Sequence, residues 1–199
     1  WEAAFRGVIR SLELDGKRIG VEPRHLRLLE FHYVRDAAPK AEFPDASFAL
    51  ADLRVRKDPD EVQKMRRAVQ IAQSALEATL PLIKIGMTER EVASELVMQL
   101  LKHGSESEMP FAPIVSAGPN SANPHASPSD RKLQAGDLLV VDWGAAYDGY
   151  ISDLTRTFAV GEVDEECQKI HKIVQESNAA GRAAAKPGAS CADVDKAAR

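Results

Sequence analysis

The sequence has few cysteines, no long apolar run and no leader-like beginning. Its two cysteines, Cys167 and Cys191, do not form a Cys-x-x-Cys pair. This argues against a disulfide scaffold or a cysteine zinc site, and we expect both to be small core or surface residues. No stretch approaches the ~18 apolar residues of a membrane-spanning helix, and no signal-peptide pattern opens the chain. We therefore expect a cytoplasmic protein with no membrane partner.

The chain also lacks an excess of positive charge. It has 26 Lys and Arg residues against 30 Asp and Glu residues, a net charge of −4. Nucleic-acid-binding domains usually carry a basic patch, so we expect no nucleic-acid partner. With 44% hydrophobic and 28% charged residues, the composition is that of a globular protein. A length of 199 residues suits one domain plus part of another.

The first 57 residues have an alternating pattern. Helical spacing over 5–12 is followed by a short strand pattern at 18–21 and by a helix over 23–31 that begins with proline. Residues 48–51 indicate a strand or turn. We interpret residues 1–57 as the C-terminal part of a small α/β domain.

A boundary follows, and residues 58–199 are predicted to form a second domain. Asp58 and Pro59 suit the start of a helix over 59–80, which has apolar residues every three to four positions. Thr88 and Glu91 form a capping box that begins a second helix, and Gly104 ends it.

Two apolar strands, 138–141 and 151–160, are joined by Asp148-Gly149. This dipeptide indicates a type I′ hairpin turn, which requires positive φ at both central residues. A turn centred there places Asp142 opposite Thr155 and Gly144 opposite Asp153. The two aspartates become diagonal neighbours on one face, roughly 7 Å apart.

Carboxylates within an apolar sheet are unfavourable unless a positive charge compensates them. We therefore interpret Asp142 and Asp153 as oxygen ligands for one or two divalent cations, with magnesium, manganese, zinc or cobalt as candidates. The alternative is that both are solvated carboxylates at strand ends.

A polar loop over 119–131 lies between a strand at 111–118 and the hairpin, and it contains His125. Loops of this kind often carry function. His125 could donate a hydrogen bond into the aspartate site or could simply be solvated.

The order of predicted elements then begins to repeat. A helix over 163–185 is followed by a capped start at Ser190 with Asp193 three residues later. Residues 60–65 resemble 165–170, and 84–88 resemble 186–190. The chain therefore contains one complete unit of helix, helix, strand and hairpin, and the helices of a second unit.

These motifs resemble the pita-bread metallopeptidases, which include Xaa-Pro aminopeptidase, Xaa-Pro dipeptidase (prolidase), methionine aminopeptidase and creatinase. The resemblance rests on VDWG at 141–144, YDGY at 147–150 and SDLTRTF at 152–158, with the second aspartate eleven positions after the first. Ser-Ala-Gly at 116–118 and Asn-Pro-His at 123–125 add to it.

The resemblance implies an α+β pita-bread fold, preceded by the remnant of a creatinase/prolidase-type N-terminal domain. It implies two divalent metal ions, with manganese favoured over cobalt or zinc, held by five ligands. Asp142 and Asp153 match two of these ligands, and His125 matches a catalytic histidine that contacts substrate. The remaining histidine and two glutamates have no match, so the chain resembles an incomplete, inactive piece of a longer enzyme.

For the full-length protein, the resemblance implies hydrolysis of Xaa-Pro bonds by a metal-bridging hydroxide. The substrate would be a small peptide with proline at its second position, and the protein would be a homodimer. Two alternatives are a creatinase-like amidinohydrolase and a metal-free binding module. Such relatives do not depend on the ligand aspartates, so the presence of Asp142 and Asp153 argues against both.

Overall fold

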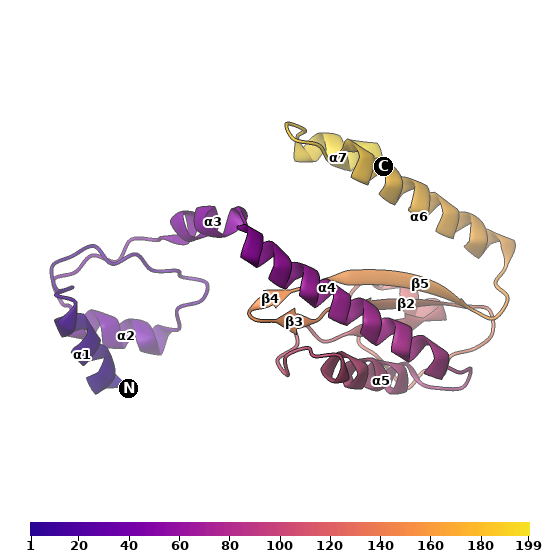
Figure 1. Ribbon diagram of the computed structural model, residues 1–199, viewed down its shortest axis with the longest axis horizontal. Helices are drawn as coiled ribbons and strands as arrows, with labels where there is room; N and C mark the ends of the chain where they lie inside the picture. Colours follow the sequence, from indigo (N-terminus) through magenta and orange to yellow (C-terminus); the bar gives the residue numbers. More distant parts are fainter. The chain divides into compact units, whose positions relative to one another are not determined.

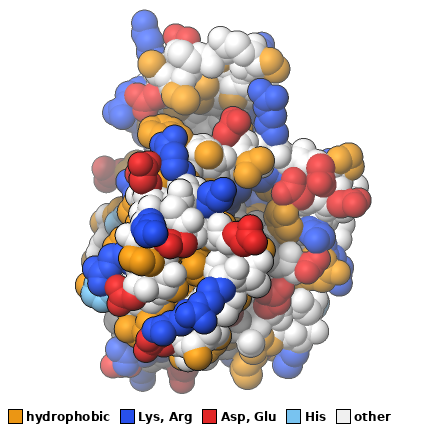
Figure 2. Space-filling view, turned by 90° about the vertical axis from the view of Figure 1, so that its left-hand side faces the viewer, with side chains coloured by type: hydrophobic (Ala, Val, Ile, Leu, Met, Phe, Trp, Pro, Cys, Tyr) orange, Lys and Arg blue, Asp and Glu red, His pale blue; other side chains and the backbone are white.

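The computed structural model describes residues 1–199, which divide into two compact units, Trp1–Asp60 and Glu61–Arg199. None of the helices is both long enough and apolar enough to cross a membrane. On the face drawn in Figure 2, positive and negative side chains are interspersed, with no large patch of one sign.

The first unit contains three helices, α1 (Glu2–Ser11), α2 (Leu28–Ala37) and α3 (Ser47–Val55). Helix α1 packs on α2, where the rings of Phe5 and Tyr33 lie 5.7 Å apart. The predicted strand at 18–21 contributes only isolated parallel bridges, from Arg18 to Glu42 and from Val21 to Asp45.

Two predictions in this unit are wrong. The helix predicted over 23–31 begins at Leu28, because Arg27 has an extended backbone with ψ of 150° and separates α2 from a single preceding turn. The strand or turn predicted over 48–51 is part of α3, whose start is fixed by a hydrogen bond from the Ser47 N–H to the Asp45 carboxylate. A short apolar run does not distinguish a strand from a helix.

The second unit carries the predicted order of helix, helix, strand, hairpin, helix and helix (Figure 1). Its elements are α4 (Pro59–Thr79), η1 (Leu80–Leu82), α5 (Glu89–Lys102), β1 (Ile114–Ala117), η2 (Gly118–Ala122), β2 (Asp137–Trp143), β3 (Ala146–Tyr147), β4 (Tyr150–Ile151), β5 (Leu154–Val160), α6 (Glu165–Ala184) and α7 (Cys191–Ala198).

The predicted capping boxes are confirmed at the starts of α5 and α7. At each start, the Thr88 or Ser190 side chain accepts from the backbone N–H three residues later. The Glu91 or Asp193 carboxylate accepts from the cap residue's own N–H. These local bonds satisfy donors that the first helical turn leaves unpaired.

The three-stranded sheet is antiparallel, in the order β1-β2-β5. β3 and β4 extend the hairpin toward the turn, where Asp148 has φ of +48° and Gly149 has φ of +77°. Positive φ at both residues confirms the predicted type I′ geometry. The pairing of Asp142 with Thr155 is confirmed as well.

One face of this sheet packs on α4 and α5. Residues alternate along β2, with Leu139, Val141 and Trp143 each 1% exposed and facing the helices. The Trp143 Nε1–H donates to the Ala72 carbonyl of α4 at 2.8 Å, which fixes the strand to the helix. The side chains between them, Asp142 included, therefore project from the opposite face of the sheet.

Candidate functional site

Asp142 lies on the outward face of the hairpin. Its neighbours Val141 and Trp143 are buried against the helices, so strand alternation directs the half-buried Asp142 side chain outward. The Thr155 hydroxyl, directly across on β5, donates to Asp142 Oδ1 at 3.0 Å. This bond orients the carboxylate and occupies one of its two oxygens.

Asp153 is exposed and directly precedes β5. Trp143 pairs with Leu154, and the Ser152 N–H donates to the Ala145 carbonyl at 2.9 Å. The same register therefore runs through the gap between the two short ladders and sets Asp153 across from Gly144. By this register, Asp153 lies diagonally from Asp142 on the outward face, as the turn position predicts.

Gly144 allows the two strands to approach closely between the aspartates. A Cβ atom at this position would lie 2.0 Å from the Ser152 carbonyl oxygen. It would also lie 3.0 Å from Pro110 Cγ and 3.1 Å from Phe111 Cε1. Only glycine fits here without moving backbone.

The two aspartates suit part of a metal site. Carboxylate oxygens are the ligands that hard divalent cations prefer, and here two are carried on one face by paired strands. Within residues 1–199, however, no group of three or more His, Cys, Asp or Glu side chains is arranged to hold an ion. Asp142 and Asp153 are therefore two candidate ligands on one face and do not form a complete cluster.

His125 lies in the loop between η2 and β2 and is exposed. Its backbone N–H donates to the Asn123 side-chain oxygen at 3.0 Å. No hydrogen bond or ion pair joins it to Asp142 or Asp153. Its predicted substrate contact therefore stays a prediction.

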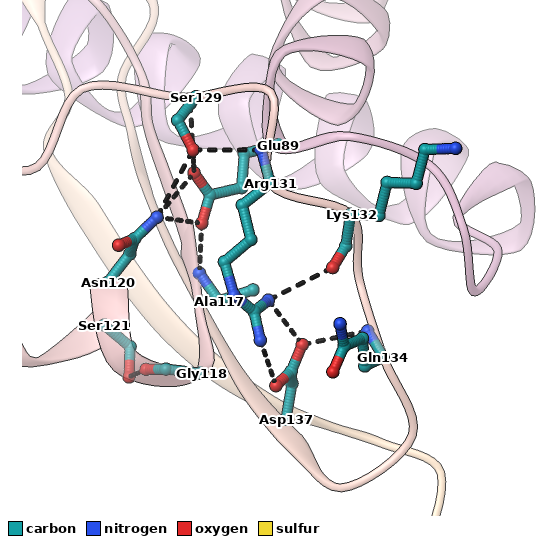
Figure 3. A network of polar contacts seen from close by, with 10 residues as sticks. All are labelled: Glu89, Ala117, Gly118, Asn120, Ser121, Ser129, Arg131, Lys132, Gln134 and Asp137. Atoms are coloured by element: carbon teal, nitrogen blue, oxygen red, sulfur yellow. Dashed lines mark hydrogen bonds and ion pairs between the residues drawn. The ribbon is translucent and has the colours of Figure 1, made fainter.

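Sequence reasoning missed a buried carboxylate that organises this loop. Glu89, the first residue of α5, is 0% exposed. It accepts from the Ala117 N–H at 2.8 Å, from the Asn120 amide at 3.1 and 3.2 Å, and from Ser129 (Figure 3). The Ser129 N–H lies at 3.0 Å and its hydroxyl at 2.6 Å.

These hydrogen bonds hold Glu89 in its charged form. Burial raises the pKa of Glu89, but the donors from Ser129, Ala117 and Asn120 outweigh it and bring the pKa below its ordinary value of 4.5. Every group that faces the carboxylate is a donor, which only an ionised acid can fully satisfy. The local signal, a glutamate beside a capping box, points only to a helix start.

An ion pair between Arg131 and Asp137 lies between the end of this loop and the start of β2. Arg131 donates two hydrogen bonds to Asp137, at 2.7 and 2.8 Å, and the Gln134 N–H donates to the same carboxylate at 2.9 Å (Figure 3). The Arg131 guanidinium lowers the pKa of Asp137 against the raising effect of burial. Gly118 turns over this pair with φ of +53°, and a Cβ there would lie 2.5 Å from Asp137 Oδ1.

An antiparallel sheet backed by two helices, with paired carboxylates on its other face, suits a metal-dependent hydrolase. The model of Metallopeptidase family M24 matches residues 63–199. The chain belongs to this family.

Both the sequence relatives and the solved structures that this chain resembles support this assignment. An uncharacterised peptidase of Staphylococcus aureus is 34% identical over 179 residues, which are 90% of this chain and 51% of that protein. The X-Pro aminopeptidase from Thermotoga maritima MSB8 matches with a TM-score of 0.88 and 30% identity, over 99% of this chain and 55% of that one. The prolidase from Pyrococcus furiosus matches with a TM-score of 0.85 and 32% identity, over 98% of this chain and 56% of that one.

The predicted α+β pita-bread architecture is confirmed over the part that the chain spans. That part is about half the length of the curated relatives it matches.

Proposed function

We propose that the full-length protein hydrolyses peptide bonds before proline, as an Xaa-Pro aminopeptidase or an Xaa-Pro dipeptidase. The observation that carries this proposal is the placement of Asp142 and Asp153 as diagonal neighbours on the outward face, in a chain of the M24 family. The names of the solved relatives support the substrate class.

Asp142 and Asp153 are the residues of this chain that would hold divalent cations, with manganese as the first candidate. Such cations, when bound, would lower the pKa of water and polarise a carbonyl group. The Thr155 hydroxyl donates to Asp142 Oδ1, so Oδ2 is the oxygen that remains freer to bind a metal. Hydrogen bonds to metal-binding carboxylates commonly hold them in one orientation.

His125 would contact the substrate near the scissile bond. Its exposure on a polar loop leaves the imidazole accessible to a bound peptide. The nitrogen of a proline residue in a peptide bond has no N–H to offer. Recognition of the bond would therefore depend on the shape of the ring and on the free amino end of the substrate.

The test compares an Xaa-Pro dipeptide with a longer Xaa-Pro peptide, using the full-length protein with and without manganese. Cleavage of the dipeptide alone would assign a prolidase, and cleavage of the longer peptide would assign an aminopeptidase. Asp142→Asn and Asp153→Asn should each abolish cleavage and lower the bound metal measured by mass spectrometry.

The matched control is Asp148→Asn, which makes the same charge change at the tip of the same hairpin. Asp148 pairs with Lys64 at 2.7 Å, away from the outward pair, and asparagine suits its positive φ. This variant should retain activity and metal. If no peptide is cleaved in either metal state, the hydrolase proposal fails and the binding-module alternative remains.

A further inference from the structure

We propose that Glu89 is a positioning residue for His125, acting through the loop that carries the histidine. This inference rests on the proposed function, because it takes its consequence from the role of His125 in peptide hydrolysis. The residues that carry it are the buried carboxylate and the two loop side chains that meet there, Asn120 and Ser129.

The Glu89 carboxylate joins the two ends of a loop, and we call the junction of Glu89, Asn120 and Ser129 the neck of this loop. Asn120 and Ser129 both donate to Glu89, and the Asn120 amide also donates to the Ser129 hydroxyl at 3.3 Å. The eight residues 121–128 therefore leave and return at one point, and His125 lies within them. Tying both ends of a loop reduces the conformations open to residues between them.

The neck is in turn fixed to rigid elements. Glu89 is the first residue of α5, and the Ala117 N–H that it accepts belongs to the last residue of β1. The Glu89 N–H donates to the Arg131 carbonyl at 3.0 Å, and the Arg90 N–H donates to the Ser129 carbonyl at 3.2 Å. A side chain on a loop held in this way can be placed reproducibly, which catalysis requires.

The chemistry of the neck demands a carboxylate. In Glu89→Gln, the amide NH₂ would face either the donors of Ser129 or those of Ala117 and Asn120. At least one buried donor would lose its acceptor, and the neck would open. Asn120 and Ser129 would then separate, and His125 would sample more positions.

Ser129→Ala is the milder test, because it removes one hydroxyl and leaves the carboxylate intact. Its matched control is Ser127→Ala, which deletes the same group from the same loop, where the hydroxyl makes no hydrogen bond. For Glu89→Gln the control is Glu91→Gln, which makes the same change on the same helical turn, at a residue bonded only to Thr88.

The first measurement is hydrogen exchange of residues 121–128 in the full-length protein. Exchange should rise at least tenfold in Ser129→Ala and Glu89→Gln and stay unchanged in both controls. This arm needs no substrate, so it remains decisive if the protein does not cleave Xaa-Pro peptides. Unchanged exchange in the two neck variants would overturn the proposal.

The second measurement is a double-mutant cycle on the rate of cleavage. Ser129→Ala should lower kcat by about tenfold with little change in KM or metal content, as expected for a displaced catalytic group. In a His125→Ala background the same change should have no further effect on kcat. If the tenfold loss persists without His125, or if His125→Ala does not affect the rate, the positioning role is refuted while the peptidase activity stands.

Discussion

Replacing Gly144 with alanine should separate the two strands that carry the aspartates. The added Cβ would lie 2.0 Å from the Ser152 carbonyl oxygen, whereas ordinary contact begins near 3.4 Å. The backbones must therefore move apart by about 1.4 Å, the difference between these two distances. The added Cβ would also lie 3.0 and 3.1 Å from side-chain atoms of Pro110 and Phe111, closer than ordinary contact.

The energetic cost follows from the contacts that such a shift breaks. The Ser152 N–H donates to the Ala145 carbonyl at 2.9 Å, and the Ser152 hydroxyl bonds both the Ala145 N–H and the Ala68 carbonyl. Each hydrogen bond contributes about 0.5–1.5 kcal/mol, and overpacking typically costs about 1–3 kcal/mol. We expect the free energy of unfolding to fall by roughly 3–5 kcal/mol.

Urea unfolding of the full-length protein, followed by tryptophan fluorescence, measures this change because Trp143 is buried beside the substitution. Gly149→Ala is the control, since it also adds a methyl group in the hairpin. There φ is +77° and no atom lies within 4 Å, so only backbone strain of about 1–2 kcal/mol is expected. If Gly144→Ala is no more destabilising than Gly149→Ala, the close-approach argument is wrong.

Three further predictions concern the core, the buried acid and the first helix. Trp143→Phe removes the donor to the Ala72 carbonyl and should cost about 1–3 kcal/mol in thermal unfolding, without altering the strand register. Because the folded pKa of Glu89 lies below 4.5, its stabilisation is complete above that pH and is lost as pH falls through the folded pKa, so Glu89→Gln should flatten the unfolding free energy measured across this acid range. Gly7→Ala fills open space within α1 and should stabilise the first unit by about 0.5–1 kcal/mol, seen as a later urea midpoint.

Arg156 shows how far strand pairing alone decides the role of a side chain. Arg156 pairs with the inward-facing Val141, so its side chain projects from the face of the sheet opposite to Asp142. Its guanidinium donates to the Thr155 carbonyl and makes no salt bridge. Its observed polar contact is therefore with backbone and not with an acidic side chain.

The sequence by itself determined the features that depend on residues close in the chain. Capping boxes at Thr88 and Ser190 and the turn at Asp148-Gly149 act over two to four residues, so their geometry follows from local chemistry. The diagonal placement of Asp142 and Asp153 on the outward face follows as well, because the turn fixes the register and the register fixes the face.

Only the tertiary structure decided the role of Glu89. Its acceptor oxygens meet donors 28 and 40 residues away, at Ala117 and Ser129, and no spacing within the sequence indicates that encounter. The start of α2 and the helix at 47–55 were not predicted, because their apolar periodicity is weak and neither helix contains a buried residue. Short-range hydrogen bonds are encoded where they occur, whereas a buried carboxylate acquires its partners only when distant segments pack together.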